Sequence, residues 1–174
     1  KVFSFKNFKD FDKNIFIKKK KWNREKTHKT LFQKLWTNFT LKQYKNERLT
    51  RYNKRLKINN LKKLVKNKKI VDFGCGHGNF LFACLHMGAE KCDGIDYGIE
   101  SIRYAKKVSK KLKLSRKTNF FKRTVYNTKL KKNYYDFAIQ NGVFHHLDNE
   151  EKAYKEMHRV LKKKGYCWIY SCGH

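Results

Sequence analysis

The sequence lacks the long apolar segment that a transmembrane helix requires. No apolar run approaches 18 residues, whereas about 20 are needed to cross a bilayer as a helix. The first twenty residues are rich in Phe and Lys and contain no continuous apolar core, so they do not have the pattern of a secretory signal peptide. We therefore predict a protein with no membrane span.

Paired cysteine spacings are also missing. The five cysteines, Cys75, Cys84, Cys92, Cys167 and Cys172, form no C-x-x-C pair. An odd number without such spacing favours reduced thiols and a cytoplasmic location, and it argues against a structural zinc site. We expect no metal centre in this chain.

Acidic residues are few and proline is absent. Forty-four basic residues stand against 14 acidic ones, which gives a formal net charge of +30. Such a charge is typical of proteins that bind nucleic acids. However, 36 of the basic residues are Lys and only 8 are Arg, although Arg is favoured for base readout and for bidentate phosphate contacts. The composition bias of an AT-rich genome therefore remains an alternative explanation of the charge.

The charge is concentrated in the first part of the chain. Residues 1–70 contain 24 basic and 4 acidic residues. Apolar residues recur there at helical spacing, from about residue 30 and again from Leu49 to Val65. A length of 174 residues predicts about one domain with a short appendage. We interpret residues 1–66 as a basic helical extension and residues 67–174 as the main domain.

The main domain shows alternating strand and helix patterns. The strand-like segments are residues 70–73, 91–95, 119–125, 134–140 and 165–171, and the helix-like segments are residues 79–87, 99–112 and 150–161. This alternation predicts an α/β fold with a doubly wound parallel sheet that carries helices on both faces.

A glycine-rich loop follows the first of these strands. Gly74, Gly76 and Gly78 separate the strand from the next helix, and glycines there allow a tight turn and close contact with a ligand. Asp96 ends the second strand, 24 residues after Asp72, and a carboxylate at this place can accept hydrogen bonds from both hydroxyls of a ribose. The sequence therefore predicts a ligand that contains an adenosine-type ribose.

The spacing of the loop indicates which kind of ligand it is. A dinucleotide fingerprint is G-x-G-x-x-G/A, but here the glycines follow G-x-G-x-G and Asn79 occupies the sixth position. Asp72 lies two residues before the first glycine, where a carboxylate suits a zwitterionic amino-acid group better than a pyrophosphate. A nicotinamide-dependent oxidoreductase is therefore disfavoured.

Residues 69–171 resemble the class I S-adenosylmethionine-dependent methyltransferases, most closely their type-11 branch. Four motifs carry the resemblance in the order of the family: residues 71–78, 94–96, 135–147 and 156–165. The resemblance implies a Rossmann-like sheet of order 3-2-1-4-5. The family sheet normally continues beyond the fifth strand, so the chain resembles a fragment truncated at its C-terminus.

The resemblance also implies roles in binding S-adenosylmethionine. The Gly74–Gly78 loop, with Cys75, would lie under the methionine part of the cofactor. Asp72 would bind its ammonium group, Asp96 its ribose, and Tyr97 one face of its adenine.

The resemblance also concerns residues that follow the third and fourth predicted strands. Asn141 and its neighbour Gly142 would line the reactive side of the cofactor. Thr124 occupies the position after the third strand where the family usually has an acidic residue that binds the adenine amino group. The expected adenine contact is therefore altered in this chain.

The expected activity is methyl transfer to an acceptor that the sequence does not identify. The Pro-Pro-Tyr type of motif found in nucleic-acid amino-methylases is absent, since residues 140–143 read Gln-Asn-Gly-Val, and this favours a small-molecule acceptor. The basic N-terminal third favours RNA or another polyanion instead. Thr124 and the short C-terminus leave room for a cofactor-binding module without activity.

No catalytic residue follows from the resemblance. His145 and His146 are candidates for a general base, and a structural or cofactor-lining role is their alternative. The predicted strand at residues 165–171 would form an aromatic, unpaired sheet edge, and such edges promote self-association.

Overall fold

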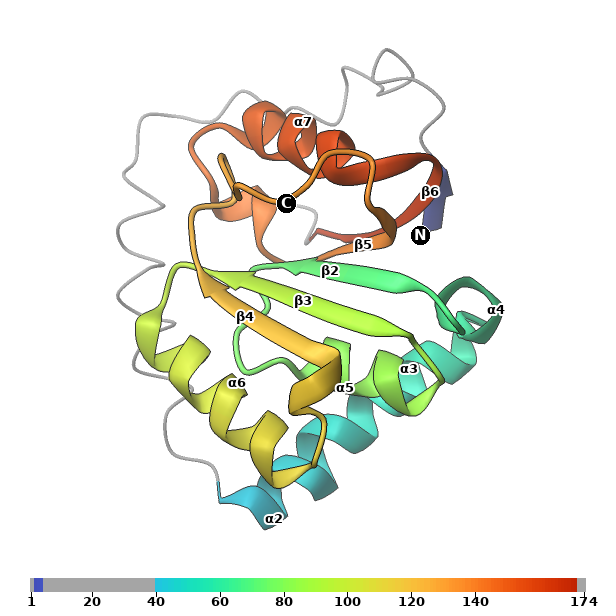
Figure 1. Ribbon diagram of the computed structural model, residues 1–174, viewed down its shortest axis with the longest axis vertical. Helices are drawn as coiled ribbons and strands as arrows, with labels where there is room; N and C mark the ends of the chain where they lie inside the picture. Colours follow the sequence, from blue (N-terminus) through green and yellow to red (C-terminus); the bar gives the residue numbers. More distant parts are fainter. Residues whose placement is uncertain (1, 5–39, 172–174) are drawn as a thin grey trace.

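The computed structural model describes residues 2–4 and 40–171. These residues form an α/β fold in which helices pack on a central sheet (Figure 1). Its sheet has six strands in the order β1-β6-β5-β2-β3-β4. The strands are β1 (Val2–Ser4), β2 (Lys69–Phe73), β3 (Lys91–Asp96), β4 (Thr118–Lys122), β5 (Tyr135–Asn141) and β6 (Leu161–Tyr170). β2 to β6 are mutually parallel, and numbered along the chain they lie in the order 3-2-1-4-5. The Rossmann-like sheet that the sequence predicts is therefore confirmed.

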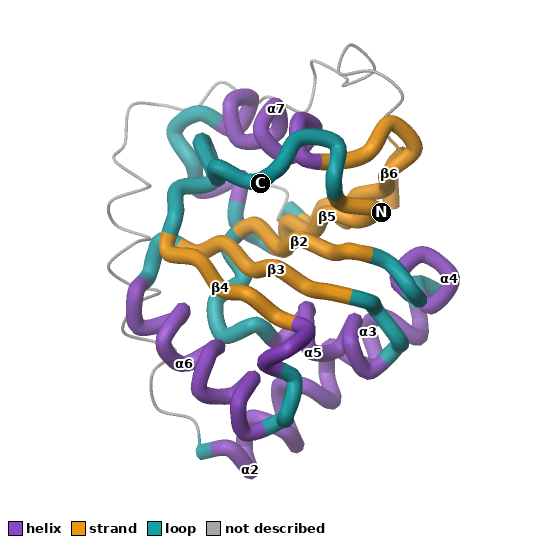
Figure 2. Tube along the Cα trace, viewed as in Figure 1, coloured by secondary structure: helices purple, strands orange, loops and turns teal. Residues whose placement is uncertain are grey.

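Helices connect these strands and cover both faces of the sheet (Figure 2). They are α2 (Leu41–Gln43), the π-helical turn η3 (Tyr44–Leu49), α3 (Thr50–Ile58), α4 (Lys62–Val65), α5 (Asn79–His86), α6 (Ile99–Lys111), the 3₁₀ turns η4 (Ser115–Lys117) and η5 (Phe144–His146), and α7 (Glu150–Val160). α7 lies on one side of the sheet, and α3, α5 and α6 lie on the other (Figure 1).

The two faces of the sheet bury different hydrophobic clusters. Successive residues of a strand point to opposite faces, so Ile70 packs in the cluster that contains α3, α5 and α6, whereas Val71 and Phe73 pack in the cluster that contains α7. Residues 70–73 of β2 are all buried, as expected for a central parallel strand covered on both faces.

Most predicted elements agree with the structure to within a few residues, with two differences. β4 ends at Lys122 and does not reach residue 125. β6 begins at Leu161, directly after α7, because Leu161 already pairs with Tyr135 before an irregularity in the register. The exposed residues 162–164 therefore belong to the strand, although the sequence pattern predicts its start at residue 165.

The helical pattern from Leu49 to Val65 is confirmed by the end of η3 and by α3 and α4. The part of the first helical pattern at residues 30–39 lies outside the described residues. Tyr44, Leu56 and Val65 are fully buried and share a cluster with Phe80 and other residues of α5. The helices around residue 50 are thus part of the core, and the domain boundary at residue 66 stays a prediction.

The expectation of an unpaired edge at β6 is wrong over part of its length. β1 pairs antiparallel with β6, with Val2 opposite Trp168 and Ser4 opposite Tyr166. The N-terminus of the chain itself supplies a partner strand, which a pattern confined to residues 165–171 could not indicate. Self-association stays a prediction. Within residues 2–4 and 40–171, no helix is both long and apolar enough to span a membrane.

Candidate functional site

The loop between β2 and α5 lies at the carboxyl end of the sheet and follows the glycine pattern closely. Gly74, Gly76 and Gly78 have φ angles of 80°, 50° and 77°, a region that residues with a Cβ rarely adopt. A Cβ on Gly74 would also lie 2.5 Å from Val143 Cγ2. The backbone N–H groups of Gly74 and Cys75 donate to the Ile95 carbonyl at 2.7 and 2.9 Å, which fixes the loop against β3.

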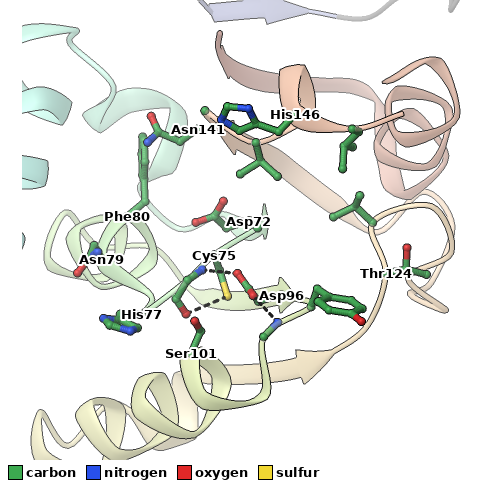
Figure 3. A pocket seen from close by; sticks show the side chains of 18 of the residues that line it. Asp72, Cys75, His77, Asn79, Phe80, Asp96, Ser101, Thr124, Asn141 and His146 are labelled. Atoms are coloured by element: carbon green, nitrogen blue, oxygen red, sulfur yellow. Dashed lines mark hydrogen bonds between the residues drawn. The ribbon is translucent and has the colours of Figure 1, made fainter. Parts of the chain in front are cut away.

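Asp96 holds two segments of backbone together at the end of β3. Its Oδ2 accepts a hydrogen bond from Gly76 N–H at 2.8 Å, and its Oδ1 accepts one from Gly98 N–H at 2.7 Å (Figure 3). Burial raises the pKa of Asp96, and these backbone hydrogen bonds oppose the rise. Each carboxylate oxygen still has a lone pair for a ligand.

Asp72 lies near the end of β2, and its environment differs from that of Asp96. It is 3% exposed, and its Oδ1 is buried without a hydrogen-bond partner among the described residues. Burial raises the pKa of Asp72 well above its ordinary value, and the nearby Asp96 raises it further. A buried carboxylate without a partner is unfavourable unless a ligand supplies a cation or a donor.

These groups surround a cavity of about 260 Å³. Eight of the nine predicted cofactor-binding residues line it: Asp72, Gly74, Cys75, Gly76, Asp96, Tyr97, Thr124 and Asn141. Tyr97 is 51% exposed and lies at the mouth. The structure therefore brings together residues from four strand ends that are up to 69 positions apart in the sequence.

Gly78 is the exception and does not line the cavity. It is the N-cap of α5 in a left-handed conformation. A Cβ there would lie 2.9 Å from Phe82 Cε2 and 3.0 Å from Phe120 Cε1. Its position is consistent with a role in packing the loop on the core.

The two candidate histidines face different surroundings. His146 lines the cavity, whereas His145 does not and is 9% exposed. Their rings lie 3.8 Å apart, centroid to centroid. Of the two, only His146 is placed where it could contact a ligand.

Asn141 is held by a side-chain network that the sequence did not indicate. Arg55 Nη1 and Trp168 Nε1 donate to Asn141 Oδ1 at 2.9 and 3.3 Å. Asn141 Nδ2 donates to the Tyr52 hydroxyl at 3.4 Å. Tyr52 also lines the cavity, although it belongs to α3 and lies within the helical apolar pattern from Leu49 to Val65.

Other lining residues come from the glycine loop, from helix starts and from loops. They include His77, Asn79, Phe80, Ser101, Val125 and Leu147. The pKa of His77 is lowered to about 4, mainly by burial and also by Arg48, and its carbonyl accepts a hydrogen bond from the Tyr44 hydroxyl at 3.0 Å. Its position inside the glycine loop was a signal that could have identified it.

The fold and this cavity define a nucleotide-type cofactor site at the carboxyl end of a doubly wound sheet. A family of methyltransferase domains (Methyltransf_31, "Methyltransferase domain") matches residues 64–174. This match covers more than half of the chain, so the chain belongs to that family. It does not test the resemblance to the type-11 branch.

Curated relatives match shorter parts of the chain. Norajmaline N-methyltransferase of Rauvolfia serpentina is 28% identical over 112 residues, which are 63% of this chain and 37% of that protein. Ribosomal protein L11 methyltransferase of Shewanella piezotolerans is 44% identical over 41 residues, which are 24% of this chain and 14% of that protein. The chain thus spans well under half the length of these relatives.

Solved structures share the fold over more of the chain. A Methanococcus maripaludis structure described as a putative S-adenosyl-L-methionine-dependent methyltransferase has a TM-score of 0.68 at 18% identity, and the match covers 90% of this chain and 67% of that one. A methyltransferase of Aquifex aeolicus has a TM-score of 0.56 at 25% identity and covers 72% of this chain and 69% of that one.

The family implies S-adenosylmethionine as the cofactor, and the described residues fit it. The buried Asp72 Oδ1 without a partner suits an ammonium group. A Cβ on Gly76 would meet nothing within 4 Å, so the backbone there is open to close contact with a ligand. Asp96 supplies paired acceptors beside the same loop.

Proposed function

We propose that this protein transfers the methyl group of S-adenosylmethionine to a small-molecule acceptor. The observation that supports this most directly is that Asp72, the glycine loop and Asp96 line one cavity, with Asp72 Oδ1 buried and lacking a partner in the described part of the chain. This set matches the ammonium, methionine and ribose portions of the cofactor.

Each residue would have a distinct task at the site. The cofactor, when bound, supplies a methyl group activated by its sulfonium, so the protein mainly has to bind and align the reactants. Asp72 would pair with the ammonium group, and Asp96 would accept hydrogen bonds from the ribose hydroxyls. Tyr97 and Thr124 would contact the adenine end, and Asn141 would lie on the side that the acceptor approaches.

The acceptor class is argued from observations other than those that support the cofactor. The relatives are named for norajmaline and for ribosomal protein L11, so their names point to different acceptors. The preference for a small molecule rests on the absence of the nucleic-acid amino-methylase motif at residues 140–143.

An Asp96→Ala variant tests the cofactor site. We expect its affinity for S-adenosylmethionine to fall by about ten- to a hundredfold, since hydrogen bonds to a charged group contribute roughly 1.5–3 kcal/mol. Asp96→Asn should keep part of the affinity, because an amide oxygen still accepts a hydrogen bond. Titration calorimetry measures both values.

A matched ligand separates direct contact from loop support, because Asp96 also holds Gly76 and Gly98. In the wild-type protein, 2′-deoxy S-adenosylhomocysteine should bind more weakly than S-adenosylhomocysteine. In Asp96→Ala this difference should vanish. If the 2′-hydroxyl contributes equally in both proteins, Asp96 does not bind the ribose and the assignment is wrong.

RNA is the second candidate acceptor, because residues 1–70 carry 24 basic and only 4 acidic residues. Phosphate contacts release counterions, so RNA affinity should drop by about tenfold or more between low and physiological salt. Removal of residues 1–30 should then weaken the binding. Weak binding that is equal with and without this segment would favour composition bias as the origin of the charge.

A further inference from the structure

A second hollow lies along η3 and α3. Its lining residues are Asn46, Glu47, Thr50, Arg51, Lys54, Arg55, Ile58 and Asn59. Three of these side chains are cationic, and Glu47 is the only anionic one in the set. The hollow is therefore positively charged.

The three cations lie on α3, and within the described part of the chain none of them forms an ion pair with a carboxylate. Lys54 and Arg55 follow Arg51 by three and four positions, so each of them is a neighbour of Arg51 on the helix surface. Among the ion pairs of the described residues, none involves any of the three. Like charges at this spacing repel one another, and a bound anion would remove that repulsion.

Arg55 connects this hollow to the methyl-transfer site. Its Nη1 donates to Asn141 Oδ1 at 2.9 Å, and Asn141 lines the cofactor cavity. Its guanidinium lies 4.9 Å from the ring centroid of Tyr170 and 5.9 Å from that of Trp168. The side chain is thus held in place while most of its five N–H donors remain for another acceptor.

We propose that this hollow binds an anionic group of the methyl acceptor, and that the acceptor is a small molecule that carries a phosphate or diphosphate. Arginine binds phosphate oxygens in a bidentate geometry, and Arg51 with Arg55 supplies two such groups on adjacent turns. The link through Asn141 places the anion next to the side of the cofactor cavity that the acceptor approaches. The proposal rests on the proposed methyltransferase function and extends it to the acceptor.

Calorimetric titration of pyrophosphate tests this subsite. The protein is first saturated with S-adenosylhomocysteine, and the ionic strength is held constant. We expect saturable binding of pyrophosphate, and a decrease in affinity of tenfold or more in both Arg51→Gln and Arg55→Gln. Lys107→Gln is the matched control, since it removes one positive charge from an exposed position on α6, and its affinity should stay within twofold of the wild type.

Three results would overturn the proposal. Pyrophosphate could fail to bind, the control could lose as much affinity as the two arginine variants, or a single-stranded RNA could bind with an affinity that grows with its length and does not depend on Arg51. The last result would favour a polyanion surface. The affinity for S-adenosylhomocysteine is measured first in each protein, so loss of the proposed function is distinguished from loss of the anion subsite alone.

Discussion

The environment of Asp72 disfavours the ionised form of its side chain. Its side chain is buried and Oδ1 has no partner among the described residues, and its pKa is raised by burial and by Asp96. Groups of this kind are concentrated at functional sites. A cation or a donor that enters the cavity would offset the cost of burying this carboxylate.

Replacing Asp72 should separate stability from binding. We expect Asp72→Asn to raise the melting temperature of the ligand-free protein by about 2–4 °C at pH 7, which corresponds to ~1 kcal/mol. The reason is that the asparagine side chain has nearly the shape of aspartate but carries no charge that must be buried. The same variant should bind S-adenosylmethionine at least about tenfold more weakly. A thermal melt and a calorimetric titration measure the two effects, and a lower melting temperature with unchanged affinity would contradict both.

The raised pKa of Asp72 also predicts how stability depends on pH. In the unfolded chain its pKa is about 3.9, and in the folded protein it is well above that. The folded state therefore binds more protons between these two values, and the Asp72 contribution to stability falls as pH rises through that range. Denaturant titrations of the ligand-free wild type and of Asp72→Asn should differ increasingly as pH rises, and should converge below about pH 4.

The glycine loop shows how one element meets two separate requirements. Gly74 needs a positive φ and also lacks space for a side chain, since a Cβ would meet Val143 at 2.5 Å. Gly76 needs a positive φ but has open space at its Cβ position. Packing therefore requires a glycine at position 74, whereas the backbone at Gly76 has room for close contact with a ligand.

Alanine at these two positions should therefore have different effects. We expect Gly76→Ala to cost about 1 kcal/mol of stability for its backbone conformation and to lower cofactor affinity by more than this. Gly74→Ala should cost more stability, roughly 2–4 kcal/mol, since overpacking adds to the strain. Denaturant melts and cofactor titrations on both variants measure this, and a larger stability loss in Gly76→Ala would contradict it.

At the scale of the molecule, the helices before residue 64 complete the core, although they precede the segment that the methyltransferase family matches. Leu56 of α3 is fully buried and belongs to the cluster of α5, whereas Ile58 on the same helix is 80% exposed. α3 also supplies Tyr52 to the cavity wall. The methyltransferase fold and its N-terminal helices therefore depend on each other.

Two substitutions on α3 test this dependence. We expect Leu56→Ala to lower the free energy of unfolding by about 2–5 kcal/mol, the usual cost of a cavity in a core. Ile58→Ala is the control, and it should change the free energy of unfolding by less than about 0.5 kcal/mol. Denaturant unfolding measures both, and equal, small effects would show that the helix is an independent appendage.

The sequence by itself determined the class of fold and, through the family resemblance, implied the strand order and most of the residues that line the cavity. The reason is local: β2, the glycine loop and α5 follow one another in the chain, and Asp72 and Asp96 sit at strand ends that a parallel sheet must bring to one edge. Only the tertiary structure decided the remaining features. The strand β1 on the edge of β6, the packing role of Gly78, and the hydrogen bonds from Arg55 to Asn141 and from Asn141 to Tyr52 all depend on contacts between distant segments. Such contacts leave no periodic pattern in the sequence, because they arise from how the elements pack and not from how each one forms.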